Sequence, residues 1–478
     1  MRDSYLHGLL ALLVAAAGLT SPGAIDSAEA ATPEQIIETK VLDNGLKIIS
    51  IEDPSLPIVT IEMALRHGAF AESPEFDGLS HLYEHMFFKG NAAIPDQEAY
   101  LQRMKELGIV FNGTTSTERV NYFFTLPTRN LRKGMEFMEH AIRTPKFNEQ
   151  EFAKEKKIVL SEYDRAESNP SYAFQRTMQR KLWYEYPSRK ITLGSREAIA
   201  NATIEQMREI KDTYYVPNNA ALIVAGDITA DRAFELAQKV FGDWPTGDNP
   251  FETNPVPEHP PLKDKEIFIQ EGEVKVPTVD IRWHGPSVDT APEATYAADV
   301  LSFILGQPSS QFQKALVESE IALNANLSYY TQAHTGPILA RASVRRDNIR
   351  TAVETLLKEL HKLADPDYFT DQQLANAKTI LETRDIYSRE KTSQYAHTIS
   401  FWWAVDDIDY YLNYVDNLNQ VTREDIASYV EEYILNDPYV LGVLLGPQDR
   451  KAIDLTEEKL RKMVADIEAK LENGGTDQ

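Results

Sequence analysis

Two histidines and a glutamate lie within five positions of one another in the stretch Gly78–Gly90, GLSHLYEHMFFKG. From Leu79 the pattern is helical, so His81 and His85 lie about 40° apart on one face, with Glu84 beside them. Two neutral imidazoles at this spacing suit a zinc ion, which proteins bind through nitrogen, sulfur and carboxylate oxygen. The alternative is a surface helix with two unrelated histidines, and the motif alone does not exclude it.

A catalytic zinc site needs a third protein ligand and an open coordination position. The chain has no cysteine, so any metal must be bound by His, Asp or Glu. In the predicted helix Glu151–Glu167, Glu155 and Glu162 are seven residues apart, nearly two turns, and point the same way. One carboxylate could bind the metal while the other accepts a hydrogen bond from a ligand imidazole. For Glu155 a solvated position among three lysines is equally consistent, whereas the apolar run before Glu162 favours burial of that residue.

The length and the charge of the chain limit the classes of function. At 478 residues the chain is about two to three times the size of a typical domain, so we expect more than one domain. The formal charge of -24 repels nucleic acid and anionic lipid, so we expect no nucleic-acid ligand. This charge would mildly favour basic peptides as ligands, although an acidic surface that serves only solubility is the commoner explanation.

The first 30 residues have the pattern of an export signal. The apolar run Leu9–Leu19 is followed by small and polar residues that end in Ala28-Glu29-Ala30, which predicts cleavage before Ala31. The alternative is an uncleaved membrane anchor, but this run falls well short of the roughly 20 residues that span a bilayer. We therefore expect a soluble mature chain without a membrane span, exported to the periplasm or another extracytoplasmic compartment. The absence of cysteine fits an oxidising compartment.

Two segments about 220 residues apart resemble each other. Thr203–Gly226 and Thr422–Gly446 each run from a threonine through a helical pattern and a turn to an apolar strand that ends on glycine. A fainter similarity pairs the alternating strands that begin at Pro57 and Pro277. Because both similarities occur in the same order, they indicate a duplicated α+β unit.

The prolines between Pro245 and Pro261 predict an extended linker between the two units. We therefore predict a signal peptide at 1–30, an N-terminal unit with the metal motif at 35–248, a proline-rich linker at 249–264 and a homologous C-terminal unit without a metal motif at 265–472. In each unit, alternating strands such as Gly45–Glu52 and Ile58–Leu65 are separated by helical patterns. This pattern favours an α+β fold in which each unit is a largely antiparallel sheet with helices packed on one face.

The motif and its surroundings resemble the pitrilysin family of zinc metallopeptidases, which includes insulysin and the mitochondrial processing peptidase. The order His-x-x-Glu-His is the inverzincin signature. It is followed after 76 residues by Glu162, with Glu155 seven residues before that. The likeness covers nearly the whole mature chain and includes Arg66–Gly68, Phe88–Gly90, Phe111–Ser116, Asn121–Phe124 and Tyr215–Asn219. It implies a pitrilysin/LuxS-like metallohydrolase fold.

For the site, the resemblance implies that His81, His85 and Glu162 hold one zinc ion per chain. It also implies that Glu84 acts as general base and then as proton shuttle in the hydrolysis of a peptide bond. Glu155 is expected to accept a hydrogen bond from a ligand imidazole.

The resemblance further implies that the substrate is added as a strand to a sheet edge, here Asn112, Gly113, Thr114 and Thr115. A simple turn is the alternative for Asn-Gly-Thr, on turn composition alone. Main-chain pairing tolerates many side chains, so we expect peptides or unfolded segments of proteins as substrates.

One part of the family's pattern is missing. Self-sufficient members carry an arginine, followed seven positions later by a tyrosine, that hold the substrate over the zinc. Alignment on Ser309–Leu316 places Val317 and Asn324 there. Residues that could compensate, without support from their spacing, are Tyr329, Tyr330 and Arg341. We therefore expect a partner chain, either a homologous subunit without zinc that supplies this pair in a heterodimer, or a second copy in a homodimer.

The leading interpretation is thus an exported zinc endopeptidase or oligopeptidase. One alternative is a non-catalytic structural member of the same fold, against which the complete set of metal-site residues argues. Another is a metal-binding or solute-binding protein of the envelope without turnover. Glu84 argues against this second alternative, because a zinc carrier needs no base beside the ligands.

Overall fold

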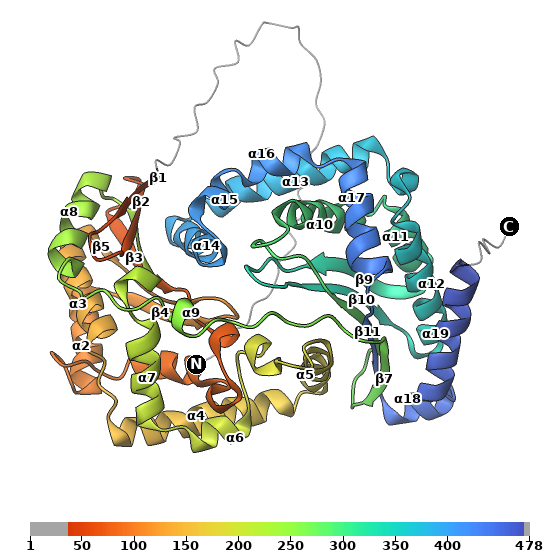
Figure 1. Cartoon of the computed structure of the whole chain (residues 1–478), viewed down its shortest axis with the longest axis horizontal. Coiled ribbons are helices and arrows are strands. Elements are labelled where there is room, and N and C mark those ends of the chain that lie inside the picture. Colours follow the sequence, from red (N-terminus) through yellow and green to blue (C-terminus); the bar gives the residue numbers. More distant parts are fainter. Residues whose placement is uncertain (1–36, 473–478) are drawn as a thin grey trace, which may run out of the picture. The chain divides into compact units, whose positions relative to one another are not determined.

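The structure is a computed structural model that describes residues 37–472 (Figure 1). The predicted signal peptide at 1–30 lies outside the described residues. Within residues 37–472, no helix combines the length and the apolar character that crossing a membrane requires.

The first sheet is largely antiparallel and has six strands in the order β1-β2-β6-β3-β5-β4. Only β2 and β6 are parallel neighbours. The strands are β1 (Ile37–Val41), β2 (Lys47–Glu52), β3 (Ile58–Leu65), β4 (Val110–Thr115), β5 (Val120–Pro127) and β6 (Ala220–Gly226). The strand β4 therefore lies at an edge of the sheet.

The second sheet repeats this topology in five strands, in the order β7-β11-β8-β10-β9. Its first and last strands in the sequence, β7 and β11, are again the parallel pair, and the other neighbours are antiparallel. The strands are β7 (Glu266–Glu271), β8 (Thr278–His284), β9 (Ala322–Tyr329), β10 (Pro337–Val344) and β11 (Val440–Leu445). The predicted α+β fold with two duplicated units is confirmed.

Each half has its own apolar core, which lies between one face of its sheet and the helices packed on that face. The helices up to the second sheet are α1 (Leu79–Phe87), α2 (Gln97–Leu107), α3 (Leu131–Arg143), α4 (Glu149–Glu167), α5 (Pro170–Leu182), α6 (Arg196–Asn201), α7 (Ile204–Tyr214), α8 (Ala230–Phe241) and α9 (Pro250–Thr253). Those that follow are α10 (Pro292–Leu305), α11 (Gln311–Gln313), α12 (Ile349–Lys362), α13 (Asp371–Ser388), α14 (Thr392–Val405), α15 (Ile408–Leu412), α16 (Tyr414–Gln420), α17 (Arg423–Val430), α18 (Pro447–Ala452) and α19 (Glu457–Glu472).

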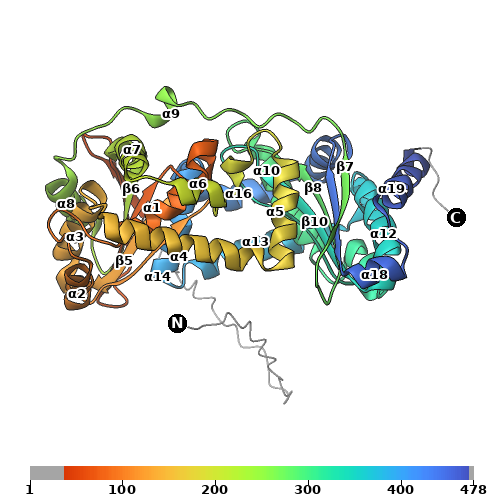
Figure 2. The same ribbon diagram turned by 90° about the horizontal axis from the view of Figure 1, so that it is seen from below.

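Each half also contributes one helix to the other half's sheet. In α14, Tyr395, Ile399 and Trp403 form a buried cluster with residues of β2, β3 and β6. These strand residues alternate with those that face the first half's own helices, so α14 covers the opposite face of the first sheet. Figure 2 shows α5 turned sharply away from α4, and α5 packs in the same way against β7 and β11. The two halves are therefore interlocked through their cores.

The predicted linker at 249–264 contains the short helix α9 and otherwise no helix or strand. It connects the part of the chain that forms the first sheet to β7, the first strand of the second sheet. Proline cannot donate to a sheet and fixes its own backbone angle, which is consistent with this irregular connection.

Candidate active site

The helix α1 is fixed at its N-terminus by a buried carboxylate. Glu72 accepts hydrogen bonds from the backbone N–H groups of Gly78 and Ser80, each at 2.7 Å. These groups have no partner within the helix, so the carboxylate satisfies them in the manner of a cap. Burial raises the pKa of Glu72 to about 8, although these hydrogen bonds favour its ionised form. The segment before α1 thereby sets the position of the helix that carries the motif.

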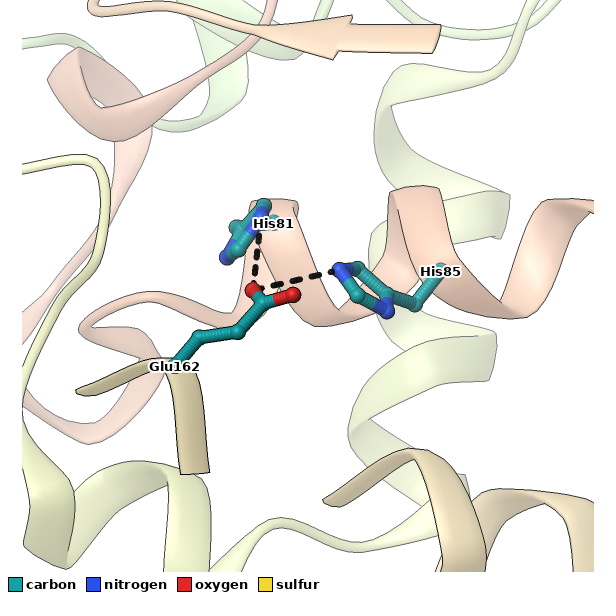
Figure 3. A group of neighbouring side chains, drawn as sticks. All are labelled: His81, His85 and Glu162. Carbon is teal, nitrogen blue, oxygen red and sulfur yellow. Dashed lines mark ion pairs between the residues drawn. The ribbon is translucent and has the colours of Figure 1, made fainter. Parts of the chain in front are cut away.

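His81 and His85 of α1 meet Glu162 of α4 in one group (Figure 3). Glu162 Oε2 lies 3.9 Å from His81 Nε2 and 3.7 Å from His85 Nε2. One ligand atom from each of the three residues lies within 4.8 Å of the others, and no other such group of His, Cys, Asp or Glu occurs in the part of the chain that the structure describes. The four-residue spacing of the histidines places both on one face of α1, and the packing of α4 against α1 brings Glu162 to them.

The donor atoms of this group fit a zinc ion. Two imidazole nitrogens and one carboxylate oxygen are among its usual ligands, and at bond lengths of about 2.0–2.2 Å tetrahedral donors lie roughly 3.3–3.6 Å apart. The observed separations of 3.7 and 3.9 Å need only small shifts to reach that range. The three side chains are also partly exposed, which leaves a path for a metal and a substrate.

The burial expected for Glu162 was wrong, whereas for Glu155 the sequence left open both a solvated position and a position beside a ligand imidazole. The side chain of Glu162, expected to be buried, is 34 % exposed, whereas that of Glu155 is only 2 % exposed. Of the apolar run before Glu162, Val159 and Leu160 pack against the core of the first half, whereas Glu162 itself lies beside the histidine pair. Glu155 is instead covered by α1 and the residues that follow it.

Glu155 contacts His85 at Nδ1, the ring nitrogen that does not face Glu162. Its Oε2 lies 3.1 Å from His85 Nδ1, and its Oε1 forms a 2.7 Å ion pair with Lys89 Nζ. Burial alone would raise the pKa of Glu155, but the hydrogen bonds from His85 and Lys89 lower it below its usual value. An ionised Glu155 accepts the proton of His85 Nδ1, which leaves the lone pair of His85 Nε2 directed toward Glu162.

The two histidines differ in their electrostatic surroundings. Burial, with a smaller effect of the charge on His85, lowers the pKa of His81 to about 4. Burial also acts to lower the pKa of His85, but the hydrogen bond to Glu155 and the nearby carboxylates raise it above its usual value. His81 is therefore neutral near pH 7, as a metal ligand must be.

The side chain of Glu84, on α1, contacts the edge strand β4. The hydroxyl of Thr115 donates to Glu84 Oε2 at 2.7 Å. A Cβ atom at Gly113 would lie only 2.9 Å from Glu84 Cγ, so only glycine lets this strand approach the carboxylate so closely. Burial raises the pKa of Glu84, and the Thr115 hydrogen bond opposes that effect. The pKa of Glu84 is therefore shifted upward, which is the direction that favours a general base.

Asn112, Gly113, Thr114 and Thr115 form most of β4 rather than an isolated turn. Within residues 37–472, β4 pairs only with β5, so among these residues its other side carries backbone groups without a strand partner. This edge lies beside Glu84, so an extended chain added to it would pass close to that carboxylate.

The residues at the positions of the missing arginine and tyrosine lie in the second half. Val317 packs against the core of that half, and Asn324 is exposed on the edge strand β9. Of the suggested replacements, Arg341 is bound to Asp280 at 2.7 and 2.8 Å, and the hydroxyl of Tyr329 donates to a backbone carbonyl. Tyr330 is 47 % exposed.

Sequence reasoning missed Glu72, Lys89 and the role of Thr115 as a partner of Glu84. Lys89 follows His85 by four residues, a spacing that on its own has many meanings. Thr115 reaches Glu84 only through the folding of the chain, and Glu72 lies six and eight residues before the groups that it caps, which is outside the usual capping spacing.

Two family profiles match adjacent parts of the chain. "Insulinase (Peptidase family M16)" matches residues 47–196, and "Peptidase M16 inactive domain" matches residues 201–381. The first contains the residues of the candidate site, and the second begins before β6 and extends into α13. The boundary between the two profiles agrees with the sequence, in which the His-x-x-Glu-His motif occurs in the first half alone.

Several relatives are named as zinc proteases, and others as subunits of the mitochondrial-processing peptidase. The chain is 23 % identical over 438 residues to the zinc protease PqqE of Helicobacter pylori, covering 90 % of this chain and 96 % of that protein. It is 24 % identical over 355 residues to an uncharacterized zinc protease of Rickettsia felis, covering 74 % and 84 %. It is 25 % identical over 208 residues to the mitochondrial-processing peptidase subunit beta of Neurospora crassa, covering 44 % of each chain.

Solved structures share the fold. A protease from Helicobacter pylori superposes with a TM-score of 0.76 at 21 % identity, covering 86 % of this chain and 99 % of that one. The first half of the periplasmic protease PqqL from Escherichia coli gives a TM-score of 0.75 at 18 % identity, covering 91 % and 97 %. The two profiles and the peptidases among its relatives show that the chain belongs to the pitrilysin (M16) family of peptidases.

Proposed function

We propose that the chain is a zinc-dependent endopeptidase or oligopeptidase. The observation that carries this proposal is the convergence of His81, His85 and Glu162 within 4.8 Å, with Glu84 beside them on α1. Relatives named as zinc proteases support the same activity.

In this proposal His81, His85 and Glu162 hold one zinc ion per chain, and Glu155 orients His85 through its Nδ1. Zinc, when bound, supplies polarisation of the scissile carbonyl and a lower pKa for water. Glu84 accepts a proton from the attacking water and returns it to the leaving amine. Thr115 holds the Glu84 carboxylate in place through its hydroxyl.

The substrate is an extended peptide or an unfolded protein segment that pairs with Asn112, Gly113, Thr114 and Thr115 at the edge of β4. Support comes from the position of this edge beside Glu84 and from the absence of a side chain at Gly113. Backbone pairing gives affinity without selecting side chains, so cleavage is expected at many sequences.

A partner chain completes the substrate site. Val317 and Asn324 cannot supply the guanidinium and phenol expected at those positions, and Arg341 is already paired with Asp280. The partner is a homologous subunit without zinc or, as the alternative, a second copy of this chain. A relative that is itself named as a subunit, of the mitochondrial-processing peptidase, supports the first choice.

Export to the periplasm is part of the same proposal. Its basis is the pattern of residues 1–30, together with the periplasmic protease PqqL among the proteins of the same fold. Sequencing the N-terminus of the chain purified from cells would test it. A start at Ala31 is expected, and a chain that still begins at Met1 would contradict export by cleavage.

A labelled peptide library tests the activity. The chain is assayed with and without a co-purifying relative, and bound metal is measured by elemental analysis. We expect about one zinc per chain, hydrolysis that a chelator abolishes and zinc restores, and a rate that rises at least about tenfold with the partner. Zinc without hydrolysis under either condition would favour a non-catalytic or metal-binding role. A full rate from the chain alone would remove the partner from the proposal.

Thr115→Val is expected to move the acidic limb of the pH–activity profile upward by roughly 0.5–1 pH unit, since a hydrogen bond contributes about 1 kcal/mol. Burial already raises the pKa of Glu84, and loss of the Thr115 hydrogen bond raises it further. Glu84 must be ionised to accept a proton, so activity is lost as the pH falls through its pKa. The measurement is kcat/KM against pH. Thr39, an exposed threonine of β1 outside the site, is changed to valine as the control, and an unmoved limb in Thr115→Val would mean that another group controls it.

A further inference from the structure

Lys89 is a charged residue next to the candidate metal site that the proposed chemistry does not use. It follows the end of α1 and its side chain is only 14 % exposed. Its Nζ lies 2.7 Å from Glu155 Oε1, while the other oxygen of the same carboxylate lies 3.1 Å from His85 Nδ1. The ammonium of Lys89 and the imidazole of His85 therefore each contact one oxygen of the buried Glu155 carboxylate.

Lys89 is itself held in place by α2. When the amide of Gln97 is oriented so that both of its groups are satisfied, its oxygen accepts from Lys89 Nζ at 3.0 Å and its nitrogen donates to Glu151 Oε2 at 3.0 Å. The contacts therefore run from Glu151 through Gln97 and Lys89 to Glu155, which lies one turn after Glu151 on α4. This chain of contacts ends at His85.

The geometry gives Lys89 a physical role. A carboxylate that is 2 % exposed needs partners for its charge and for both oxygens, and His85 alone supplies only one of them. With both oxygens bound, the carboxylate cannot rotate away, so Oε2 stays opposite His85 Nδ1. The imidazole ring is then oriented with Nε2 facing Glu162 at 3.7 Å. Outer partners that orient ligand imidazoles in this way typically change metal affinity by about 10–100-fold.

We propose that Lys89 is a positioning residue of the metal site, which acts through Glu155 to hold His85 in its metal-binding orientation. This inference rests on the proposed zinc site. A competing effect has the opposite sign, because a cation near the site repels Zn²⁺. Positioning therefore predicts weaker zinc binding when Lys89 loses its charge, and simple electrostatic repulsion predicts tighter binding.

A set of variants of the full chain tests the role, with zinc affinity measured by competition against a chromophoric chelator at fixed pH. Lys89→Met is expected to weaken zinc binding by about tenfold, and Lys89→Arg to stay within about threefold of the wild type. In a Glu155→Gln background, Lys89→Met should cause no further loss, because its effect passes through Glu155. Lys105→Met, an exposed lysine on α2, is the matched control.

Unchanged or tighter zinc binding in Lys89→Met would overturn the proposal, as would independent losses in the double variant. Thermal unfolding of the metal-free variants shows whether they fold, and Lys89→Gln replaces Lys89→Met if the latter does not. Zinc binding is measured without a substrate, so a chain that binds zinc but hydrolyses no peptide would refute the proposed function and leave this test interpretable. A wild-type chain that binds no zinc would overturn both.

Discussion

Glu84→Gln is expected to lower kcat for peptide hydrolysis on the order of 10³-fold while zinc stays bound at one ion per chain. The amide has the shape of the carboxylate and can still accept the hydrogen bond from Thr115, so the local fold should persist. It cannot accept the proton of the attacking water, and the general-base step is lost. Steady-state kinetics and elemental analysis on the same sample provide the two readouts.

Glu149→Gln is a suitable control, because this glutamate is exposed in the first turn of α4 and does not belong to the site. It should leave both kcat and the zinc content unchanged. If Glu84→Gln kept wild-type activity, Glu84 would have no part in the mechanism. If it lost zinc as well, Glu84 would act on the metal rather than on the proton.

Glu162→Gln is expected to weaken zinc binding by roughly 10²–10³-fold. Zinc sites with four ligands bind with about 10–16 kcal/mol in total, and the loss of one ligand removes about a quarter of this free energy. Glu162 supplies the only carboxylate oxygen of the three-residue group, and a neutral amide is a poor ligand for zinc. Affinity is measured by chelator competition, and activity should return only at high zinc concentration.

The matched control for this variant is Asp164→Asn on the same helix. Asp164 is 58 % exposed and forms a surface ion pair with Arg196, so its loss should leave zinc affinity unchanged. Stoichiometric, tight zinc in Glu162→Gln would place the third ligand elsewhere.

The sequence was most informative where the pattern was local. The spacing of His81, Glu84 and His85 predicted one helical face, and α1 begins at Leu79 as expected. The alternating strands predicted near Gly45–Glu52 and Ile58–Leu65 are β2 and β3. The duplication was visible because both halves repeat the same order of helix, turn and strand, and the two sheets share one topology.

The exchange of helices between the halves could not be predicted in this way. Periodicity identifies an apolar face but does not say which sheet it will contact. In α14, Tyr395 and Ile399 pack on the first sheet while Phe401 and Trp402 pack with residues of the second half, so the sequence of this helix has no single apolar face. Only the three-dimensional structure assigns it to both halves.

The site shows the same limit. Glu155 and Glu162 were correctly expected on one helix, but Glu162 was wrongly expected to be buried. The burial of Glu155, which the sequence left open, depends on what α1 and Lys89 cover. The contact between Gly113 and Glu84 joins residues far apart in the sequence, and no sequence pattern indicates it. Patterns thus identified the reactive groups, while their supporting contacts required the fold.

Anomalous diffraction at the zinc absorption edge, on crystals of the zinc-loaded chain, tests the central claim most directly. The account predicts one strong peak about 2.0–2.2 Å from Nε2 of His81, Nε2 of His85 and a carboxylate oxygen of Glu162, with one position open to solvent. A peak at other residues, or a peak that the Glu162 carboxylate does not approach, would contradict it.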